Sequence, residues 1–370
     1  MRYSTALIAA LAATASATTA PLPKMYTLEI APGETIEVTE EEKFKMIDEG
    51  RHFFDITEFK DVHAAASRLF AAAPFPSTIQ QNCAVKELHK KINLDRIKEQ
   101  LTEYSSFHNR YFNSRYGVQA AEWLFARVNE VIEESGNPLA TARLVRHTAW
   151  SQPSVIVSLP GIIRGHTVVT GCHLDSVISN DRGAGRAPGA DDNGSGSMMN
   201  LEVLRAVLSD PRIADGDHRN TLEWHWYAAE ESGLLGSQDI FSQYAALNMQ
   251  VMAMLNQDMV GFKGRDGIER FGLVTDFTDP AQNEYLKLLI GNYTDIPYEE
   301  SLCGYACSDH ASANRNGYPS SFIFETPFGN HNPRIHTPND TIEFVDFDHV
   351  FQHAKLTTAF MYELAHATFA

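Results

Sequence analysis

The chain has 370 residues, enough for one large domain or two ordinary ones, and its hydrophobic content of 44% allows a sizeable buried core. Charged residues make up 21% of the chain, and the formal net charge is −17 at pH 7. Nucleic acid and anionic membranes carry charge of the same sign, so the sequence argues against both as partners. This charge is consistent with solubility in an extracellular medium.

The first seventeen residues have the pattern of a secretory signal peptide. Arg2 precedes an apolar stretch over residues 6–13, and Ala15-Ser16-Ala17 forms a small-residue cleavage site. The apolar stretch is too short to span a bilayer, and no later segment reaches about 18 uninterrupted apolar residues. We therefore predict a signal peptide over residues 1–17, a secreted extracellular protein and no transmembrane helix.

Residues 18–75 differ from the sequence that follows and are expected to form a small acidic module. Residues 25–38 predict one or two short strands, and Thr39 with Glu42 forms a capping box that opens a helix ending near Gly50. The small-residue and proline stretch over residues 71–77 is suited to a linker. This arrangement predicts a propeptide with an approximate boundary at residue 75, which would inhibit the mature protein or assist its folding. The alternative is an ordinary N-terminal subdomain.

From residue 76 onward the pattern predicts a single α/β domain. Residues 83–135 have helical spacing, and residues 143–150 and 154–159 are β-branched runs that fit a hairpin-like pair. Strands and helices then alternate. The predicted strands are 166–171, 222–229, 251–255 and 320–324, and the predicted helices are 195–208, 233–247, 282–289 and 347–367. Such alternation favours a mostly parallel mixed sheet sandwiched between helices.

The four cysteines and the glycosylation sequons bear on an extracellular location. Cys303 and Cys307 are close enough in sequence to form a small disulfide loop in an oxidising compartment. Cys172 follows a predicted strand and is expected to be a buried thiol, whereas Cys83 belongs to a removed segment or stays free. Sequons begin at Asn292 and Asn339, and we expect glycosylation there. A third sequon, at residues 193–195, lies inside the candidate site and is discounted.

Polar residues follow the predicted strands at their carboxyl ends, where open α/β sheets bind ligands. Two adjacent glutamates after a buried strand are costly, because like charges at that separation raise each other's pKa. Each of the other residues alone has an ordinary structural role, such as a helix-capping aspartate or a loop histidine. Their coincidence on one sheet edge favours a functional site formed by His173, Asp175, Asp191, Asp192, Glu230, Glu231, Asp258 and His336.

Two histidines with several carboxylates are typical ligands of zinc or another first-row divalent ion. Carboxylates can also bridge two ions, as in two-metal aminopeptidases. The sequence contains no His-Glu-x-x-His helix and no Gly-x-Ser-x-Gly elbow, so the commonest single-zinc protease pattern and a serine hydrolase are poorly supported. The residues therefore predict a metal-dependent hydrolase.

Six segments, taken in order, resemble a known family. They are GCHLDS, APGADDNGSGS, AAEESGLLGS, NQDMVG, CGYACSDHAS and PRIHTPND. The chain from Gln80 to its C-terminus resembles the secreted zinc leucine aminopeptidases of metallopeptidase family 28, and is similar to the fungal extracellular type. The segment before it resembles the prosegment of these enzymes. The resemblance implies a zinc exopeptidase-like fold, two zinc ions per chain and peptide substrates with a free N-terminus.

The same resemblance implies a role for each matching position. His173 and Asp258 would bind one zinc ion, Glu231 and His336 the other, and Asp191 would bridge them. Asp192 would be structural, through an unusual peptide geometry. Glu230 would act as general base and then acid, and Asp175 would orient His173. Cys303 and Cys307 would form the disulfide, with Tyr305 between them stabilising the tetrahedral oxyanion.

Substrate preference is expected to come from an apolar pocket for a leucine-like side chain. The alternative for Phe322 and Phe324 is simply strand core. We expect a monomer whose partners are peptide substrates and its own propeptide. Two other functions stay open, a one-zinc glutaminyl cyclase and a non-catalytic binding ectodomain of the same fold. The residues proposed to form the pocket are Met259, Phe322, Phe324, Phe328 and Ile335.

Overall fold

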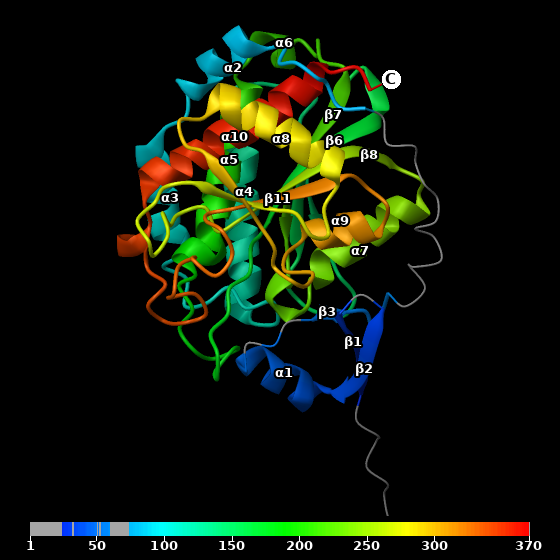
Figure 1. The fold of residues 1–370 in the computed structure, drawn as a ribbon, viewed down its shortest axis with the longest axis vertical. Coiled ribbons are helices and arrows are strands. Elements are labelled where there is room, and N and C mark those ends of the chain that lie inside the picture. Colours follow the sequence, from blue (N-terminus) through cyan, green and yellow to red (C-terminus); the bar gives the residue numbers. More distant parts are fainter. Residues whose placement is uncertain (1–23, 32, 50, 52, 60–73, 370) are drawn as a thin grey trace, which may run out of the picture.

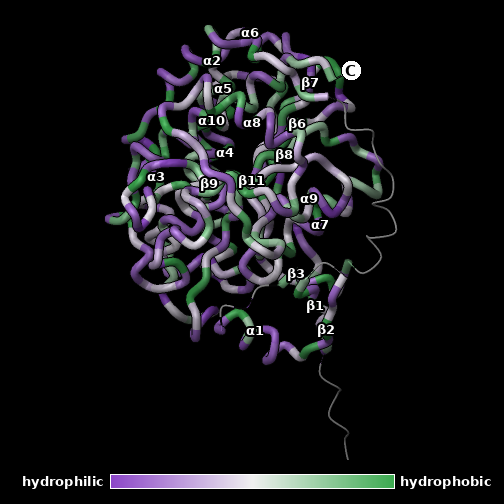
Figure 2. The backbone as a smooth tube through the Cα atoms, viewed as in Figure 1, coloured by the Kyte–Doolittle hydropathy of each residue, from purple (hydrophilic) through white to green (hydrophobic). Residues whose placement is uncertain are grey.

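The structure is a computed structural model that describes residues 24–369 except 32, 50, 52 and 60–73 (Figure 1). The expected signal peptide and residues 71–73 of the expected linker lie outside the described residues. No helix in the described part of the chain is long and apolar enough to cross a membrane. Figure 2 shows hydrophilic and hydrophobic residues mixed along the surface helix α1 (Glu40–Asp48), as expected for an element with one face against protein and one against water.

A small N-terminal module precedes the large unit. It contains β1 (Met25–Ala31), β2 (Glu34–Thr39), α1 and β3 (Phe54–Asp55), with the strands in the order β2-β1-β3. The predicted capping box is confirmed, since Thr39 N donates to Glu42 Oε2 at 2.8 Å and Glu42 N donates to Thr39 Oγ1 at 3.3 Å. Figure 1 shows the module beneath one end of the large unit.

The large unit is built on an eight-stranded mixed sheet in the order β10-β9-β11-β8-β6-β7-β5-β4. Its centre, β11-β8-β6-β7, is parallel, whereas β5 pairs antiparallel with both β7 and β4, and β9 antiparallel with β11. The predicted α/β fold class and hairpin-like pair are confirmed. The strands are β4 (Thr141–Val145), β5 (Ser154–Leu159), β6 (Ile163–His173), β7 (Asn220–Tyr227), β8 (Gln250–Asp258), β9 (Phe271–Val274), β10 (Tyr298–Ser301) and β11 (Ser320–Phe324).

Helices cover both faces of this sheet, so its central strands are buried on both sides. In β7, Trp224 and Trp226 pack in the core shared with α5 and α10, whereas Tyr227 packs in the core shared with α7. This alternation explains the largely apolar run in the sequence. The helices are α2 (Asn82–His89), α3 (Leu94–Tyr104), α4 (Arg115–Ser135), α5 (Gly196–Leu208), α6 (Pro211–Ala214), α7 (Leu235–Ala246), α8 (Pro280–Tyr293), α9 (His310–Arg315) and α10 (Phe347–His366).

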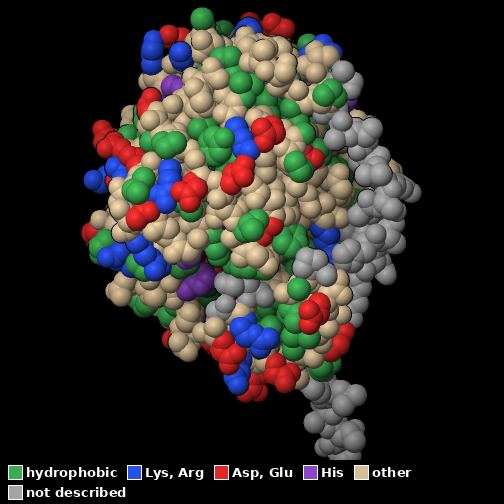
Figure 3. All heavy atoms as spheres, viewed as in Figure 1, with side chains coloured by type: hydrophobic (Ala, Val, Ile, Leu, Met, Phe, Trp, Pro, Cys, Tyr) green, Lys and Arg blue, Asp and Glu red, His purple; other side chains and the backbone are tan. Residues whose placement is uncertain are grey.

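The N-terminal module docks on the large unit at the edge where β6, β7 and β8 end. Arg182 forms an ion pair with Asp48 and donates to Phe44 O at 2.6 Å. Gly233 has φ = +106°, and a Cβ there would lie 2.7 Å from Asp55 Cβ, so only glycine allows this close approach. On the outer face drawn in Figure 3, basic and acidic side chains are interspersed over both parts.

Phe75, at the approximate boundary expected from the sequence, packs on the large unit. Phe75 stacks on Tyr285 with ring centroids 5.5 Å apart and meets Phe369 edge-on at 6.2 Å. A buried carboxylate of α10, Glu363, accepts from Gln80 N at 2.9 Å, and this anchors the chain just before α2. The segment from Phe75 onward therefore belongs to the large unit.

Candidate active site

The carboxyl ends of the parallel strands bring two histidines together around one carboxylate. His173, the last residue of β6, has Nε2 at 3.1 Å from Asp258 Oδ1 and 3.2 Å from Asp192 Oδ1. His336 Nε2 lies 2.9 Å from Glu231 Oε2 and 3.1 Å from Asp192 Oδ2. Each histidine thus has a carboxylate of its own, and the two share Asp192.

The expected bridging position of Asp191 is wrong in this geometry, because the carboxylate between the histidines belongs to Asp192. The Asp191 carboxylate instead accepts from Gly261 N at 3.0 Å and Asn332 Nδ2 at 2.9 Å. Asp192 was expected to be structural, through an unusual peptide geometry. The Asp192–Asn193 peptide is indeed cis, but the Asp192 side chain belongs to the site.

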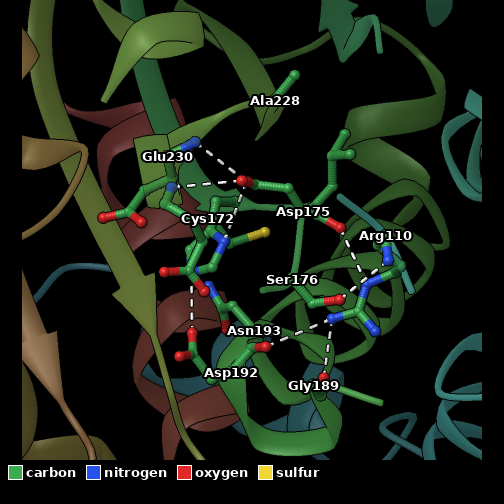
Figure 4. Close-up of polar contacts among 12 residues, drawn as sticks. Arg110, Cys172, Asp175, Ser176, Gly189, Asp192, Asn193, Ala228 and Glu230 are labelled. Atoms are coloured by element: carbon green, nitrogen blue, oxygen red, sulfur yellow. Dashed lines mark hydrogen bonds and ion pairs between the residues drawn. The ribbon is translucent and has the colours of Figure 1, made fainter. Parts of the chain in front are cut away.

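A turn after β7 presents Glu230 and Glu231 to the same space. Ala229 is left-handed at φ = +58°, which turns the chain sharply out of the strand. Asp175 holds this turn, since Glu230 N donates to its Oδ1 at 3.0 Å and Glu231 N to its Oδ2 at 3.3 Å (Figure 4). Asp175 Oδ1 also lies 3.4 Å from His173 Nδ1, in accord with the expected orienting role.

The pKa values of several groups in this cluster are raised. Burial raises the pKa of Glu230 well above its usual range, and it raises the pKa of Glu231 to about 7. Burial disfavours the imidazolium form of His173, but the nearby carboxylates of Asp258 and Glu230 raise its pKa well above the usual value. Burial and neighbouring carboxylates thus favour the protonated forms of Glu230, Glu231 and His173.

The residues present fit a divalent cation. His173, Asp192 and Glu231 each offer one ligand atom, and these atoms lie within 4.8 Å of one another. Glu231 Oε1 is buried without a hydrogen-bond partner among the described residues, which leaves a carboxylate oxygen available for a ligand. Imidazole nitrogen with carboxylate oxygen is a donor set that zinc accepts.

A cavity of about 330 Å³ opens beside this cluster. One wall carries four of the cluster's carboxylates, and the other is apolar. All five residues expected to form an apolar pocket line it. Phe322 and Phe324 are almost fully buried, at 1% and 4% exposure, so they are strand core as well as cavity wall. The five are Met259, Phe322, Phe324, Phe328 and Ile335.

The disulfide expected between Cys303 and Cys307 is present. Tyr305, between these cysteines, lines the cavity, and burial, with Glu230 adding to it, raises the pKa of its phenol, which therefore keeps its proton. Cys172 is a buried free thiol and Cys83 an exposed one. Asn292 and Asn339 are both exposed, whereas Asn193 is fully buried.

Several residues around the site were not anticipated from the sequence. The cavity is also lined by His331 and by three side chains of the N-terminal module, Ile47, Arg51 and Phe53. Asp340 accepts from the main-chain N–H groups of Asp191 and Asp192 at 3.1 and 3.0 Å. The motif PRIHTPND contains Asp340, but only the tertiary fold reveals that it supports the turn of Asp192.

An α/β sheet with histidines and carboxylates clustered at its carboxyl edge, beside an apolar cavity, defines a metal-dependent hydrolase. The profile of peptidase family M28 matches residues 154–361, more than half of the chain. A probable leucine aminopeptidase of Trichophyton verrucosum is 44% identical over 99% of this chain and 99% of its own length. Leucine aminopeptidase 1 of Neurospora crassa is 43% identical over 93% of this chain and 87% of its own.

A solved structure agrees with these sequence relationships. The LapA aminopeptidase of Legionella pneumophila superposes with a TM-score of 0.82 at 28% identity, covering 94% of this chain and all of that one. The chain therefore belongs to peptidase family M28. It is a metallo-aminopeptidase, a hydrolase that acts on peptides.

Proposed function

We propose that the protein is an extracellular dizinc aminopeptidase that releases N-terminal leucine and other hydrophobic residues. The observation that carries the proposal is the pairing of His173 with Asp258 and of His336 with Glu231 around the shared carboxylate of Asp192. Two ligand pairs with one bridge suit two ions, whereas a one-zinc glutaminyl cyclase needs only one of them. The relatives named leucine aminopeptidases support the substrate preference.

In this proposal, zinc would be held by His173, Asp258, His336, Glu231 and Asp192, and when bound would supply Lewis-acid polarisation and a lowered water pKa. Glu230 takes a proton from the attacking water and delivers it to the leaving amine. Asp175 fixes the main chain of Glu230 by accepting a hydrogen bond from its N–H group. This contact limits the positions that the Glu230 carboxylate can take up. The Tyr305 hydroxyl donates a hydrogen bond to the tetrahedral oxyanion.

The cavity supports exopeptidase selectivity. Its acidic wall attracts the protonated α-amino group of a peptide, and its aromatic wall accepts an apolar side chain next to it. Phe324 and Phe328, with ring centroids 5.7 Å apart, form part of that aromatic wall.

The decisive experiment is hydrolysis of leucine p-nitroanilide with and without a chelator, alongside zinc content per chain. We expect about two zinc ions, activity lost on chelation and activity restored by zinc. The variant Glu230→Gln should keep its zinc and lose at least a hundredfold in kcat. Metal binding with cyclisation of N-terminal glutamine peptides, but no aminopeptidase activity, would instead identify a cyclase. A protein that binds no metal would favour a binding ectodomain.

We further propose that the N-terminal module is an inhibitory propeptide that follows a cleaved signal peptide. Its support is that Ile47, Arg51 and Phe53 line the same cavity as Glu230 and Glu231, so the module narrows the space that a substrate needs. The exposed sequons at Asn292 and Asn339 are proposed to carry glycans. The mature protein is proposed to be a monomer.

A further inference from the structure

Arg110 is a fully buried arginine behind the proposed metal centre, in the segment between α3 and α4. Its guanidinium donates to three main-chain carbonyls. The distances are 3.0 Å from Nε to Leu174 O, 2.6 Å from Nη1 to Pro188 O and 2.8 Å from Nη2 to Gly189 O. No carboxylate of the described chain forms an ion pair with it. Figure 4 shows Arg110 beside the segments that carry Asp175 and Asp192.

Two further contacts hold the guanidinium in place. Nη2 lies 3.5 Å from Asp192 O, and the Tyr104 ring centroid lies 4.5 Å from Cζ, so an aromatic face covers the cation. The Tyr104 hydroxyl donates to Leu174 O at 3.0 Å, the same carbonyl that Arg110 Nε reaches. Arg110 therefore has a single defined position.

The carbonyls that Arg110 joins belong to two separate ligand segments. Leu174 lies between His173 and Asp175 at the end of β6, whereas Pro188 and Gly189 lead directly into Asp192. A planar guanidinium with five N–H donors couples two such segments more rigidly than one hydrogen bond can. The distance between the two segments is thus set by the rigid, planar spacing of the guanidinium N–H groups, here called the fork.

Gly189 allows the close approach of the fork. Its φ is +49°, and a Cβ at this position would lie 2.8 Å from Arg110 Nη2 and 2.4 Å from Asp192 O. Any larger residue would displace either the guanidinium or the turn that carries Asp192. The glycine and the arginine therefore form one structural unit.

Burying a charged guanidinium without a paired carboxylate is costly, and carbonyl dipoles offset only part of that cost. A neutral side chain could fill the same volume more cheaply if packing were the only requirement. The guanidinium instead supplies the N–H donors that join the two ligand segments. Arg110 is therefore linked to the ligand cluster through the main chain of both ligand segments.

We propose that Arg110 is a positioning residue of the metal centre, which sets the separation between His173 and Asp192 by holding their main chains together. The inference rests on the proposed metal centre. It concerns a residue that contacts neither the substrate cavity nor the ligand side chains themselves. Its loss is expected to weaken metal binding, because ligand atoms that are no longer held in place must be ordered by the metal itself.

The test uses the full chain with the variants Arg110→Lys and Arg110→Met. Lysine keeps the charge but loses the planar fork, and methionine loses both. The zinc dissociation constant of the apo protein is measured by competition with a chromophoric chelator, with far-UV circular dichroism recorded on the same samples. We expect zinc affinity to fall 10- to 100-fold in Arg110→Lys and further in Arg110→Met, with wild-type dichroism in Arg110→Lys.

Arg186 provides the matched control. It lies just before Pro188 and also donates to main-chain carbonyls, those of Ser105 and Ser106 at 3.2 and 3.3 Å, but none of these bonds joins the His173 segment to the Asp192 segment. Arg186→Lys should keep zinc affinity within about twofold of wild type, since its hydrogen bonds do not join the two ligand segments.

Two results would overturn the proposal. One is Arg110→Lys with wild-type zinc affinity. The other is loss of the dichroism spectrum in Arg110→Lys, which would make Arg110 a residue of the general core. A wild-type chain that binds no zinc at all would reject the metal centre instead, so the two failures are distinguishable.

Discussion

Two neighbouring aspartates, Asp191 and Asp192, have opposite surroundings although both are buried. Asp192 faces His173 and His336, whereas Asp191 accepts hydrogen bonds from main-chain and amide groups. The sequence motif alone could not distinguish them, because one step along a tight turn reverses the direction of a side chain. Composition and spacing are the same for either assignment.

This difference makes a paired prediction. Asp192→Asn should weaken zinc binding by more than a hundredfold, since it removes the charge shared by both histidines. Asp191→Asn should change zinc affinity less than tenfold but lower the free energy of unfolding by about 1–3 kcal/mol, because buried partners lose an acceptor. Chelator competition and urea unfolding of the apo proteins measure the two effects. Equal loss of zinc affinity in both variants would contradict the assignment.

The elements of the fold differ in how well the sequence predicts them. The strands β6, β7, β8 and β11 were all located, because apolar runs bounded by polar or glycine residues are characteristic of buried strands. The short elements β9, β10 and α9 were missed. Their four to six residues carry too little periodicity, and they are stabilised mainly by neighbours distant in sequence. The ligand-bearing strand ends were therefore predictable, but the wall contributed by the N-terminal module was not.

A series of three hydrogen bonds, on side chains outside the cavity, supports the turn after β7. Asp239 Oδ2 lies 2.6 Å from His147 Nδ1, His147 Nε2 lies 2.8 Å from Ser154 Oγ, and Ala228 N donates to Ser154 Oγ at 2.9 Å. Ser154 is fully buried, so this Ser-His-Asp arrangement cannot meet a substrate. The arrangement instead fixes Ala228, two positions before Glu230.

Ser154→Ala should therefore lower kcat about tenfold with little change in KM, because Glu230 loses its fixed position while the cavity is retained. The unpaired N–H of Ala228 should also cost about 1–3 kcal/mol of stability. Steady-state kinetics on leucine p-nitroanilide measure the first effect. Ser158→Ala, at a half-buried serine of the same strand, is the control. An unchanged kcat in Ser154→Ala would show that the turn does not need this support.

At the scale of the whole molecule, the docked N-terminal module should lower activity. Arg182→Ala removes the ion pair with Asp48 and the bond to Phe44 O, so it should raise the kcat/KM of the full chain toward that of protein trimmed before Phe75. The same substitution in trimmed protein should have no effect, which separates loss of docking from a change in the site. A full chain as active as the trimmed protein would reject inhibition by the module.

Acid should destabilise the molecule through His89, which links α2 to α10. His89 Nε2 lies 3.0 Å from Lys355 O, and burial lowers the imidazole pKa to about 4. Between pH 6.5 and 4 the unfolded chain then binds more protons at His89 than the folded one, so the contribution of His89 to stability falls as pH decreases toward 4 and stays constant below that. The free energy of unfolding of His89→Gln should depend less on pH in this window. If the free energy of unfolding of variant and wild type changed with pH in parallel, this role of His89 would be contradicted.

The N-terminal module and the anchored start of the large unit lie at opposite poles of the molecule, joined through residues 60–73 (Figure 1). Cutting that connection leaves the contacts of the module intact. If the module inhibits as proposed, it then changes from a tethered inhibitor, present at an effective concentration of about millimolar, into a free one whose occupancy follows the protein concentration. Under the proposed function, dilution after secretion becomes the step that releases activity, and a concentrated sample of cleaved protein should remain inhibited until it is diluted.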